Sequence, residues 1–129
     1  MNLNKNIYNK KDGIQELKYK DFNIKDNKIT LKSKKYKNNK TLIIFYAPWC
    51  PHCIHIAEEV KDLALTNLNK FHIIAVNIND IHNKNHLLAE KLGIHSIPSM
   101  MILKDNEIKK YDKPVNFENL FYYINMNID

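Results

Sequence analysis

Two cysteines separated by two residues, Cys50 and Cys53, are the side chains of this sequence best suited to covalent chemistry. They lie in the stretch FYAPWCPHC, after an apolar run and before a pattern typical of a helix. A pair at this spacing can bind a metal, form a structural disulfide or alternate between dithiol and disulfide. Because these are the only 2 cysteines among 129 residues, they cannot form the disulfide framework of a small secreted domain.

Hydrophobic patterns predict the elements that must position this pair. Residues 41–47, TLIIFYA, form a β-branched and aromatic run, which predicts a central strand buried on both faces. Apolar residues then recur at three- and four-residue intervals from Cys53, which predicts an amphipathic helix to about residue 69. Residues 71–78, FHIIAVNI, predict a second buried strand. A strand–helix–strand succession of this length makes a right-handed parallel crossover.

The second half of the chain continues this alternation. A helix is expected over residues 83–92, with Gly93 as its stop. SMMILK and EIKKY, residues 99–104 and 107–111, indicate an antiparallel hairpin. A last helix is expected after Asn116, which is a suitable N-cap.

The first forty residues contain few apolar positions. Short strands near residues 22–24 and 29–31, joined by an Asp-Asn turn, are the best interpretation. We assign residues 1–13 to a flexible N-terminal segment and residues 14–129 to one α/β domain. The cysteine pair then lies at the carboxyl end of a central strand, where open α/β sheets place their sites.

Two stretches of the chain are similar to a known family. FYAPWCPHC resembles the active-site stretch of the thioredoxin superfamily, and FYAPWC in particular is similar to protein disulfide isomerase domains. Residues 88–108, LAEKLGIHSIPSMMILKDNEI, resemble the family's second landmark, an Ile-Pro dipeptide followed by a hairpin. A lone C-x-x-C is a weak signal, whereas both landmarks in this order are a strong one. The resemblance implies a thioredoxin fold, a central mixed β-sheet flanked by helices, and thiol–disulfide oxidoreductase activity.

The cysteines have different expected roles in this arrangement. Cys50, at the strand–helix junction, meets unpaired N–H groups and the positive end of the helix dipole, which favour a nucleophilic thiolate. Cys53 lies one turn later beneath the helix, so we expect it to be the resolving thiol. Pro51 suits the first helical turn because it has no N–H to lose. Trp49 is expected to cover the pair and to contact a substrate peptide; a core Trp is the alternative.

Further site residues follow from the resemblance. The Pro51–His52 dipeptide resembles that of DsbA-type oxidants, whose potential is about −120 mV against about −270 mV for thioredoxin. His52 is therefore expected to make the pair more oxidising. Pro98 resembles the family's cis-proline, and the backbone of Ile97 is expected to pair with an extended substrate segment.

The sequence departs from the family at two buried positions. Ile44, six residues before Cys50, stands where the family usually carries a buried Asp or Glu, and Ala75 stands where a partnering Lys is common. A buried carboxylate can accept the proton of the resolving thiol. We therefore expect water or a nearby His to accept the proton of Cys53, and resolution to accelerate with pH through the neutral range.

Two other functions stay open at this point. His82 and His86 could complete a Cys₂His₂ zinc site with the cysteine pair, although the 28 residues between Cys53 and His82 fit no short zinc-finger spacing. A redox-inert thioredoxin-fold interaction module is the second alternative. The preferred interpretation requires neither a metal nor a cofactor.

Composition restricts the expected partners. All 20 basic residues are Lys, against 14 acidic residues, for a net charge of +6. The Lys-rich run of residues 32–40 lacks Arg and is typical of a solvated loop, so we expect no nucleic-acid partner. No apolar run approaches the about 20 residues that span a bilayer, and the N-terminus has no signal-peptide core.

The combined expectation is a monomeric enzyme of the cytoplasm. It would be either a cellular protein or a viral protein in the cytoplasm of the host cell. It would exchange disulfides with protein substrates through Cys50 and Cys53. A redox partner, which the sequence does not identify, would return the pair to its starting state.

Overall fold

The central sheet of the protein has five strands, in the order β1-β5-β4-β6-β7. The computed structural model describes residues 5–26, 28–37, 39–66, 71–105 and 107–126, and the sheet comprises β1 (Gln15–Glu16), β4 (Thr41–Tyr46), β5 (His72–Asn77), β6 (Ser99–Lys104) and β7 (Glu107–Tyr111). β1 and β4 run parallel to β5, whereas β6 is antiparallel to β4 and to β7. The predicted mixed sheet of a thioredoxin fold is confirmed.

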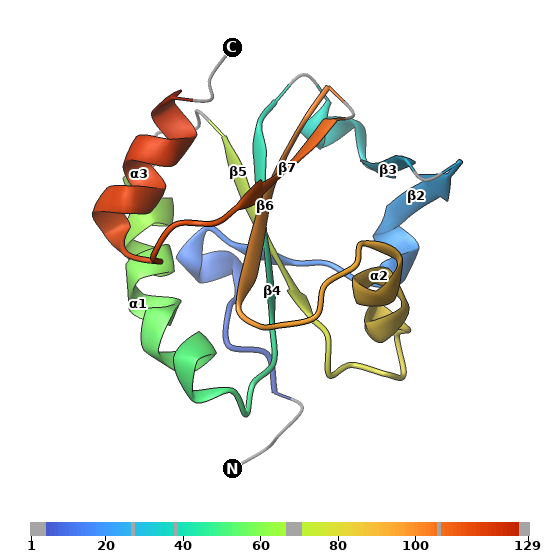
Figure 1. The fold of residues 1–129 in the computed structure, drawn as a ribbon, viewed down its shortest axis with the longest axis horizontal. Helices are drawn as coiled ribbons and strands as arrows, with labels where there is room; N and C mark the ends of the chain where they lie inside the picture. Colours follow the sequence, from blue (N-terminus) through green and yellow to red (C-terminus); the bar gives the residue numbers. More distant parts are fainter. Residues whose placement is uncertain (1–4, 27, 38, 67–70, 106, 127–129) are drawn as a thin grey trace.

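Helices cover both faces of this sheet, as Figure 1 shows. One face carries α1 (Pro51–Leu65) and α3 (Phe117–Met126), and the other carries α2 (Asn85–Lys91) with the hairpin of β2 (Phe22–Lys25) and β3 (Lys28–Leu31). Short 3₁₀ turns are η1 (Lys10–Asp12), η2 (Tyr19–Asp21) and η3 (Lys34–Tyr36). We call the two sides of the sheet the α1 face and the α2 face.

The sequence of β4 explains why it is the central strand. Its residues are all buried, as the unbroken apolar run predicted. Successive side chains of a strand point to opposite faces. Ile44 and Tyr46 therefore pack in the cluster beneath α1 and α3, whereas Ile43 and Phe45 pack in the cluster beneath α2.

Two helix boundaries differ from the predicted ones. α1 ends at Leu65, earlier than expected, because Thr66 closes its last turn: the Thr66 hydroxyl donates to the Leu63 carbonyl at 2.9 Å. α2 begins at Asn85, because Lys84 before it has a left-handed backbone with φ of 63°. The predicted central part of each helix is confirmed.

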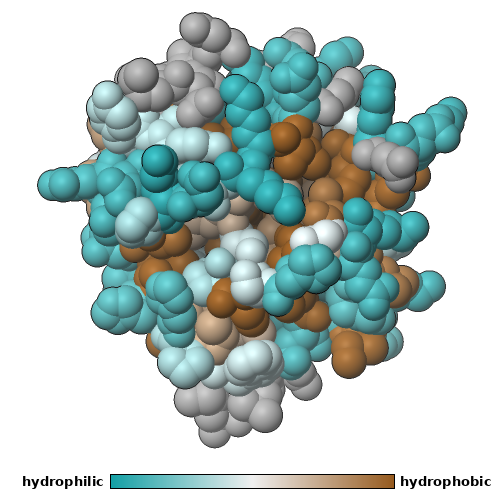
Figure 2. All heavy atoms as spheres, in the orientation of Figure 1, coloured by the Kyte–Doolittle hydropathy of each residue, from teal (hydrophilic) through white to brown (hydrophobic). Residues whose placement is uncertain are grey.

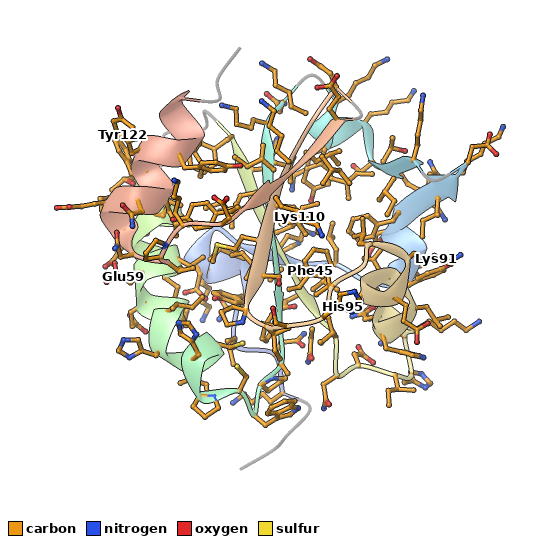
Figure 3. The ribbon with its side chains drawn as sticks, in the orientation of Figure 1. Phe45, Glu59, Lys91, His95, Lys110 and Tyr122 are labelled. Carbon is orange, nitrogen blue, oxygen red and sulfur yellow. The ribbon has the colours of Figure 1, made fainter. Side chains whose placement is uncertain are left out.

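Polar contacts hold α3 against the rest of the domain. Asn116 is its N-cap, as predicted, and accepts a backbone hydrogen bond from within the first turn at 2.8 Å. Glu59 of α1 accepts the N–H of Phe117 at 2.8 Å, and Figure 3 shows Glu59 beside the start of α3. At the other end, the buried Lys40 donates to the Ile124 carbonyl at 2.6 Å. Lys40 belongs to the run that we interpreted as a solvated loop, and it is instead part of the core.

The described part of the N-terminal segment also packs against the domain. Residues 5–13 were assigned to a flexible segment, but Tyr8 is only 2% exposed and belongs to the core cluster beneath α1. Burial of one large aromatic ring offsets much of the entropy lost in ordering a short segment. β1 follows directly and pairs with Ile74 and Ala75 of β5, a strand too short to be predicted from its pattern.

The surface in Figure 2 is mainly hydrophilic, with hydrophobic residues gathered between charged ones on the side of α2 and β2–β3. Large hydrophobic residues that are exposed include Trp49, Ile54 and Ile81. Among the described residues, no helix is long and apolar enough to cross a membrane.

Candidate active site

Cys50 is the N-cap of α1, as its position before Pro51 predicted. Its Sγ accepts the backbone N–H of Cys53 at 3.3 Å, and its carbonyl accepts the N–H of Ile54 at 3.0 Å. The sulfur therefore lies at the positive end of the helix, where an N–H group and the helix dipole stabilise a thiolate. Pro51 occupies the first helical position, where its missing N–H costs no hydrogen bond.

Cys53 lies one turn further along α1, and both cysteines are free thiols. Cys53 is 1% exposed and Cys50 is 5% exposed, so the two thiols differ less in access than we expected. The pKa of Cys53 is raised to about 12, chiefly by burial and then by its hydrogen bond with Cys50 and the charge of Cys50. At neutral pH Cys53 is therefore a protonated thiol.

Exposed side chains surround the pair. Trp49 is half-exposed, and its Nε1 donates to Asn79 Oδ1 at 3.2 Å, so it is not the core Trp that was the alternative. Pro51 and His52 are exposed on the first turn of α1. An apolar ring held by a hydrogen bond beside Cys50 is a suitable contact for a substrate peptide.

The Ile97–Pro98 peptide bond is cis. Ile97 is half-buried against the core cluster that contains both cysteines. Pro98 and His52 line one cavity of about 460 Å³, which extends between the start of β6 and the loop after β7. His95 and Lys110, labelled in Figure 3, also line this cavity. The structure thus brings His52 and Pro98, predicted from separate motifs, to one concave surface.

The buried position six residues before Cys50 holds the apolar Ile44, as the sequence showed. A carboxylate, that of Glu16, nevertheless lies in the same row of residues across the sheet. Ile44 is in register with Ala75 of β5, and Ala75 is in register with Glu16 of β1. Residues in register across parallel strands share a face, so Glu16 projects on the α1 face. At about 4.8 Å between neighbouring strands, Glu16 stands about 10 Å from the position of Ile44.

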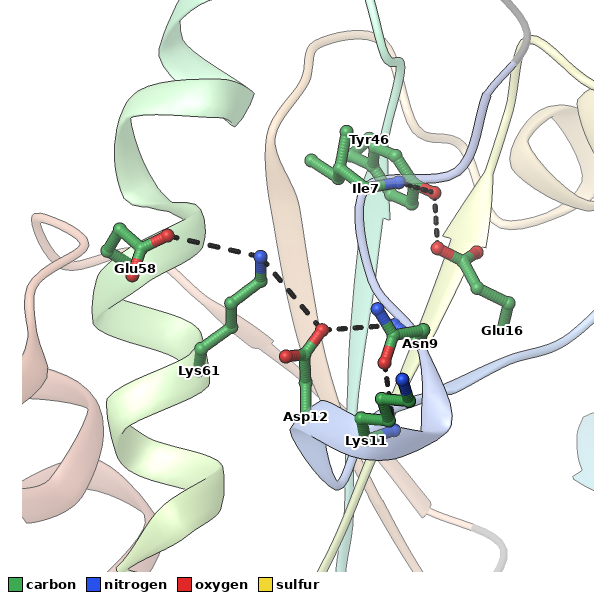
Figure 4. Close-up of polar contacts among 8 residues, drawn as sticks. All are labelled: Ile7, Asn9, Lys11, Asp12, Glu16, Tyr46, Glu58 and Lys61. Atoms are coloured by element: carbon green, nitrogen blue, oxygen red, sulfur yellow. Dashed lines mark hydrogen bonds and ion pairs between the residues drawn. The ribbon is translucent and has the colours of Figure 1, made fainter.

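Glu16 is held by hydrogen bonds, as Figure 4 shows. The Tyr46 hydroxyl donates to the Glu16 carboxylate and accepts the N–H of Ile7 at 3.2 Å. The pKa of Glu16 is raised from 4.5 to about 7, because burial disfavours the charged form; hydrogen bonds from Tyr46 and from the backbone of Tyr8 partly oppose that rise. This carboxyl group therefore titrates near neutral pH.

Tyr8 is buried in the core beneath α1, against Tyr46. Its ring packs edge-to-face on Tyr46, with centroids 5.3 Å apart, in the core cluster that contains both cysteines. The Tyr8 hydroxyl is buried and has no hydrogen-bond partner among the described residues. The pKa of Tyr8 is raised first by burial and then by the charges of Cys53, Glu16 and Asp12. Tyr8 thus lies within electrostatic reach of both Cys53 and Glu16.

The possible zinc ligands are not assembled in the structure. Among the described residues, no three His, Cys, Asp or Glu side chains are grouped so that they could hold a metal ion. His82 and His86 therefore do not join the cysteine pair. His86 lies in α2 on the opposite face of the sheet from α1.

Sequence reasoning missed the buried groups beneath the dithiol. Tyr8 and Glu16 lie in a polar stretch with no motif, and the two-residue strand β1 has no recognisable period. Their neighbour Tyr46 was predicted to be buried, because it belongs to the apolar run of residues 41–47. The signal that could have found Glu16 is its position between Ile14 and Leu17, which are both buried.

The fold and the site place the protein in a known class. A family model described as Thioredoxin matches residues 21–126, so the chain belongs to the thioredoxin family. Thioredoxin M-type, chloroplastic, of Triticum aestivum is 33% identical over 94 residues, which cover 68% of this chain and 51% of the wheat protein. Protein disulfide-isomerase MPD1 of Saccharomyces cerevisiae is 30% identical over 111 residues, which cover 86% of this chain and 31% of the yeast protein.

Solved structures show the same fold. The crystal structure of the J-Trx1 fragment of ERdj5 superposes with a TM-score of 0.72 at 21% identity, over 90% of this chain and 52% of that one. The chain spans about half or less of the length of the relatives and of this structure. The predicted family and fold are therefore confirmed.

Proposed function

We propose that this chain exchanges disulfides with protein substrates, with Cys50 as the nucleophile and Cys53 as the resolving thiol. The observation that carries this proposal is the Cys50 Sγ at the N-terminus of α1, hydrogen-bonded to the N–H of Cys53 at 3.3 Å. The N–H and the helix dipole stabilise the Cys50 thiolate, and buried Cys53 stays protonated until it is needed.

The reaction has two exchange steps. The Cys50 thiolate attacks a substrate disulfide, so that a Cys50–substrate bond forms, the substrate disulfide breaks and one substrate thiolate leaves. Cys53 then loses its proton and attacks the Cys50 sulfur, which releases the second substrate thiolate and leaves a Cys50–Cys53 disulfide. The substrate disulfide is reduced by two electrons, and the dithiol of the protein is oxidised by two. The reverse sequence oxidises a substrate dithiol.

The substrate would be an extended peptide segment beside Cys50. The exposed face of Trp49 offers an apolar contact, and the backbone at Ile97 offers hydrogen bonds to a peptide added as a strand. The cavity of about 460 Å³ between His52 and Pro98 would hold substrate side chains on the other side of the sulfur.

The net direction depends on the potential of the pair. Consider a dithiol whose reduction potential is about −120 mV, the value of DsbA. At equilibrium with a glutathione pool at about −240 mV, its dithiol form would exceed its disulfide form by about 10⁴-fold. In the cytoplasm the protein would then act as a reductant or isomerase, unless a thiol oxidase reoxidises it. His52, exposed beside the pair, is the residue that we expect to raise this potential.

The test uses serine variants of each cysteine. Cys53→Ser should accumulate mixed disulfides with substrate proteins, because attack by Cys50 proceeds and resolution does not. Cys50→Ser should trap none and should reduce a model protein disulfide at least about 10³-fold more slowly than wild type. Mass spectrometry of the trapped species identifies the bonded cysteine. Trapping on Cys53, or equal activity of all three proteins, would contradict the assignment.

A further inference from the structure

The cavity beside the dithiol carries more positive than negative charge. It has a volume of about 460 Å³ and includes His52, in the first turn of α1. Lys110 of β7 and Lys113 of the loop after it also line the cavity. His95 lies on the same lining, and Figure 3 labels it together with Lys110. Among the described residues that line the cavity, Asp112 is the one with an acidic side chain.

The two lysines are available to a ligand. Both are exposed, and neither forms an ion pair with a carboxylate of the described residues. The backbone that carries them is nevertheless held in place. The Tyr123 hydroxyl donates to the Lys110 carbonyl at 3.2 Å, and the Tyr111 hydroxyl donates to the Pro114 carbonyl at 2.7 Å. A fixed strand end and loop therefore present two unpaired ammonium groups beside the cavity.

We propose that this cavity selects protein substrates with an acidic side chain two residues from the reacting cysteine. This inference rests on the proposed function and names its substrate class. Lys110 and Lys113 are the specificity-determining residues, because each can place an ammonium group beside a carboxylate of the substrate.

The spacing of two residues follows from a peptide that adds as a strand. Side chains of an extended segment alternate, so residues two apart face the same side, about 7 Å from each other. When the substrate cysteine faces the Cys50 sulfur, its second neighbours therefore also face the protein. The cavity lies on the Pro98 side of the sulfur, where it receives one of these side chains.

The lining fits both parts of a glutamate or aspartate side chain. Met100 is buried and Val115 is half-buried at the cavity, so they offer apolar contacts to methylene groups. The lysines offer charge to the carboxylate. A basic side chain would be repelled by the lysines, and an apolar one would leave them without a partner, so the charge of the cavity discriminates between substrates.

A second Lys-rich cavity serves as an internal control. It has a volume of about 510 Å³ and is lined by Lys34 and Lys37, at η3, and by Thr41, the first residue of β4. The dithiol follows the other end of β4, roughly 16 Å away along the strand. Charge in this second cavity can attract an acidic substrate at long range, but it cannot contact a side chain next to the reacting cysteine.

The test compares three peptides that differ only at the second residue on each side of a single cysteine, which is Glu, Gln or Leu. Each cysteine is joined to thiopyridine in a mixed disulfide. Attack by Cys50 on the peptide sulfur forms a Cys50–peptide bond and releases thiopyridone, whose absorbance gives the second-order rate constant in stopped flow. Wild type should react with the Glu peptide about fivefold faster than with the Gln peptide, the upper end of the effect of an exposed ion pair. This ratio should fall as added salt screens the charges.

Three variants locate the source of this ratio. Lys110→Gln/Lys113→Gln should lower it to about one, because both ammonium groups are lost. Lys34→Gln/Lys37→Gln is the matched control, which removes the same charge at the second cavity and should keep the wild-type ratio. Asp112→Asn removes the acidic side chain beside the lysines and should raise the ratio. Any change in the reactivity of the Cys50 thiolate itself cancels, because it affects both peptides equally.

Dithiodipyridine, a small neutral disulfide, measures the chemistry without the cavity. Attack by Cys50 releases one absorbing thiol in a phase that depends on reagent concentration. Attack by Cys53 releases a second in a phase that does not. Every variant should keep both phases, which also shows that it is folded.

The outcomes separate this inference from the proposed function. If wild type shows neither phase with dithiodipyridine, the proposed function is wrong. If it shows both phases and reacts equally with the Glu and Gln peptides, the inference is wrong and the function stands. A Leu peptide that reacts faster than the Glu peptide would identify the cavity as an apolar site and overturn the inference. An equal loss of the ratio in both double variants would also overturn it, because long-range attraction would then explain the preference.

Discussion

The two faces of the sheet differ in how they treat buried polar groups. On the α2 face, the cluster around Phe45 and Leu88 is apolar, and the buried Asn85 is hydrogen-bonded: its Oδ1 accepts the N–H of Tyr19 at 2.9 Å and its Nδ2 donates to the Asn77 carbonyl at 3.0 Å. The Nδ1 of His86 is buried without a hydrogen-bond partner among the described residues. On the α1 face, beneath the dithiol, the described residues include an unpartnered hydroxyl, a carboxyl group that titrates near 7 and a thiol whose pKa is about 12.

This difference indicates separate tasks for the two faces. Burial of a carboxylate or an unpaired hydroxyl costs free energy of unfolding, so such groups persist where chemistry needs a proton to move. Among the described residues, the α2 face has one buried side-chain atom without a hydrogen-bond partner, His86 Nδ1, and its core cluster is apolar. Substitutions on the α2 face should therefore change stability without changing the chemistry, whereas substitutions of the polar groups beneath α1 should change the chemistry or its pH dependence as well.

The largest expected effect on stability is on the α2 face. Leu88→Ala should lower the free energy of unfolding by about 3 kcal/mol, because Leu88 is completely buried and its truncation leaves a cavity. Urea denaturation measures this loss. At low temperature, where the variant is folded, both phases of the dithiodipyridine reaction should keep wild-type rates. A slower second phase in folded Leu88→Ala would show that the two faces are not independent.

An effect of similar size concerns the pH dependence of stability. The pKa of Glu16 is raised in the folded protein, so its contribution to stability is fully present below pH 4.5 and is lost as pH rises through about 7. The shift from 4.5 to about 7 corresponds to a loss of about 3 kcal/mol. Glu16→Gln lacks this titration. Between pH 4 and pH 8, wild type should thus lose about 3 kcal/mol relative to Glu16→Gln in urea denaturation.

Glu107→Gln is the matched control for this measurement, because an exposed carboxylate should give no such difference from wild type. Parallel pH curves for wild type and Glu16→Gln would mean that the carboxyl group titrates normally. The α1 face would then have no carboxyl group with a raised pKa to distinguish it from the α2 face, whatever the kinetics show.

The sequence predicted most of the fold because its long elements carry clear periods. β4, with six buried residues, and α1, with its apolar stripe, could be placed from hydrophobic pattern, and Asn116 could be placed from cap chemistry. β1 could not, because a two-residue strand has no period and is formed by pairing with β5. The packing of Tyr8 is likewise a tertiary effect that overrides a polar local sequence.

The site divides in the same way. Cys50, Cys53 and Pro98 are local motifs, so their positions followed from spacing and resemblance. The absence of a carboxylate at Ile44 was also visible, and it led us to expect water or a His as the proton acceptor. Glu16 lies in the same row of the sheet on another strand, and only the register of β1 against β5 shows this. Sequence spacing cannot reveal a neighbour that depends on strand pairing.

The smallest expected effect uses two neighbours on β4 that point to opposite faces, Tyr46 and Phe45. Tyr46→Phe keeps the ring and removes the hydroxyl that stabilises the Glu16 carboxylate. The pKa of Glu16 should therefore rise. A hydrogen bond to a charged group contributes about 1.5–3 kcal/mol, so the pH at which Glu16 titrates in the folded protein should rise by about one to two units. In urea denaturation, the loss of stability with rising pH should therefore continue to higher pH in Tyr46→Phe than in wild type.

Phe45→Leu is the matched control, because Phe45 is equally buried but lies on the α2 face. It should lower the free energy of unfolding by about 1–2 kcal/mol and leave the pH profile unchanged. A structural disturbance in Tyr46→Phe would lower stability equally at every pH, whereas weaker stabilisation of the Glu16 carboxylate lowers it further above about pH 7. A uniform loss, or an equal shift in Phe45→Leu, would therefore remove Tyr46 from the network that sets the pKa of Glu16.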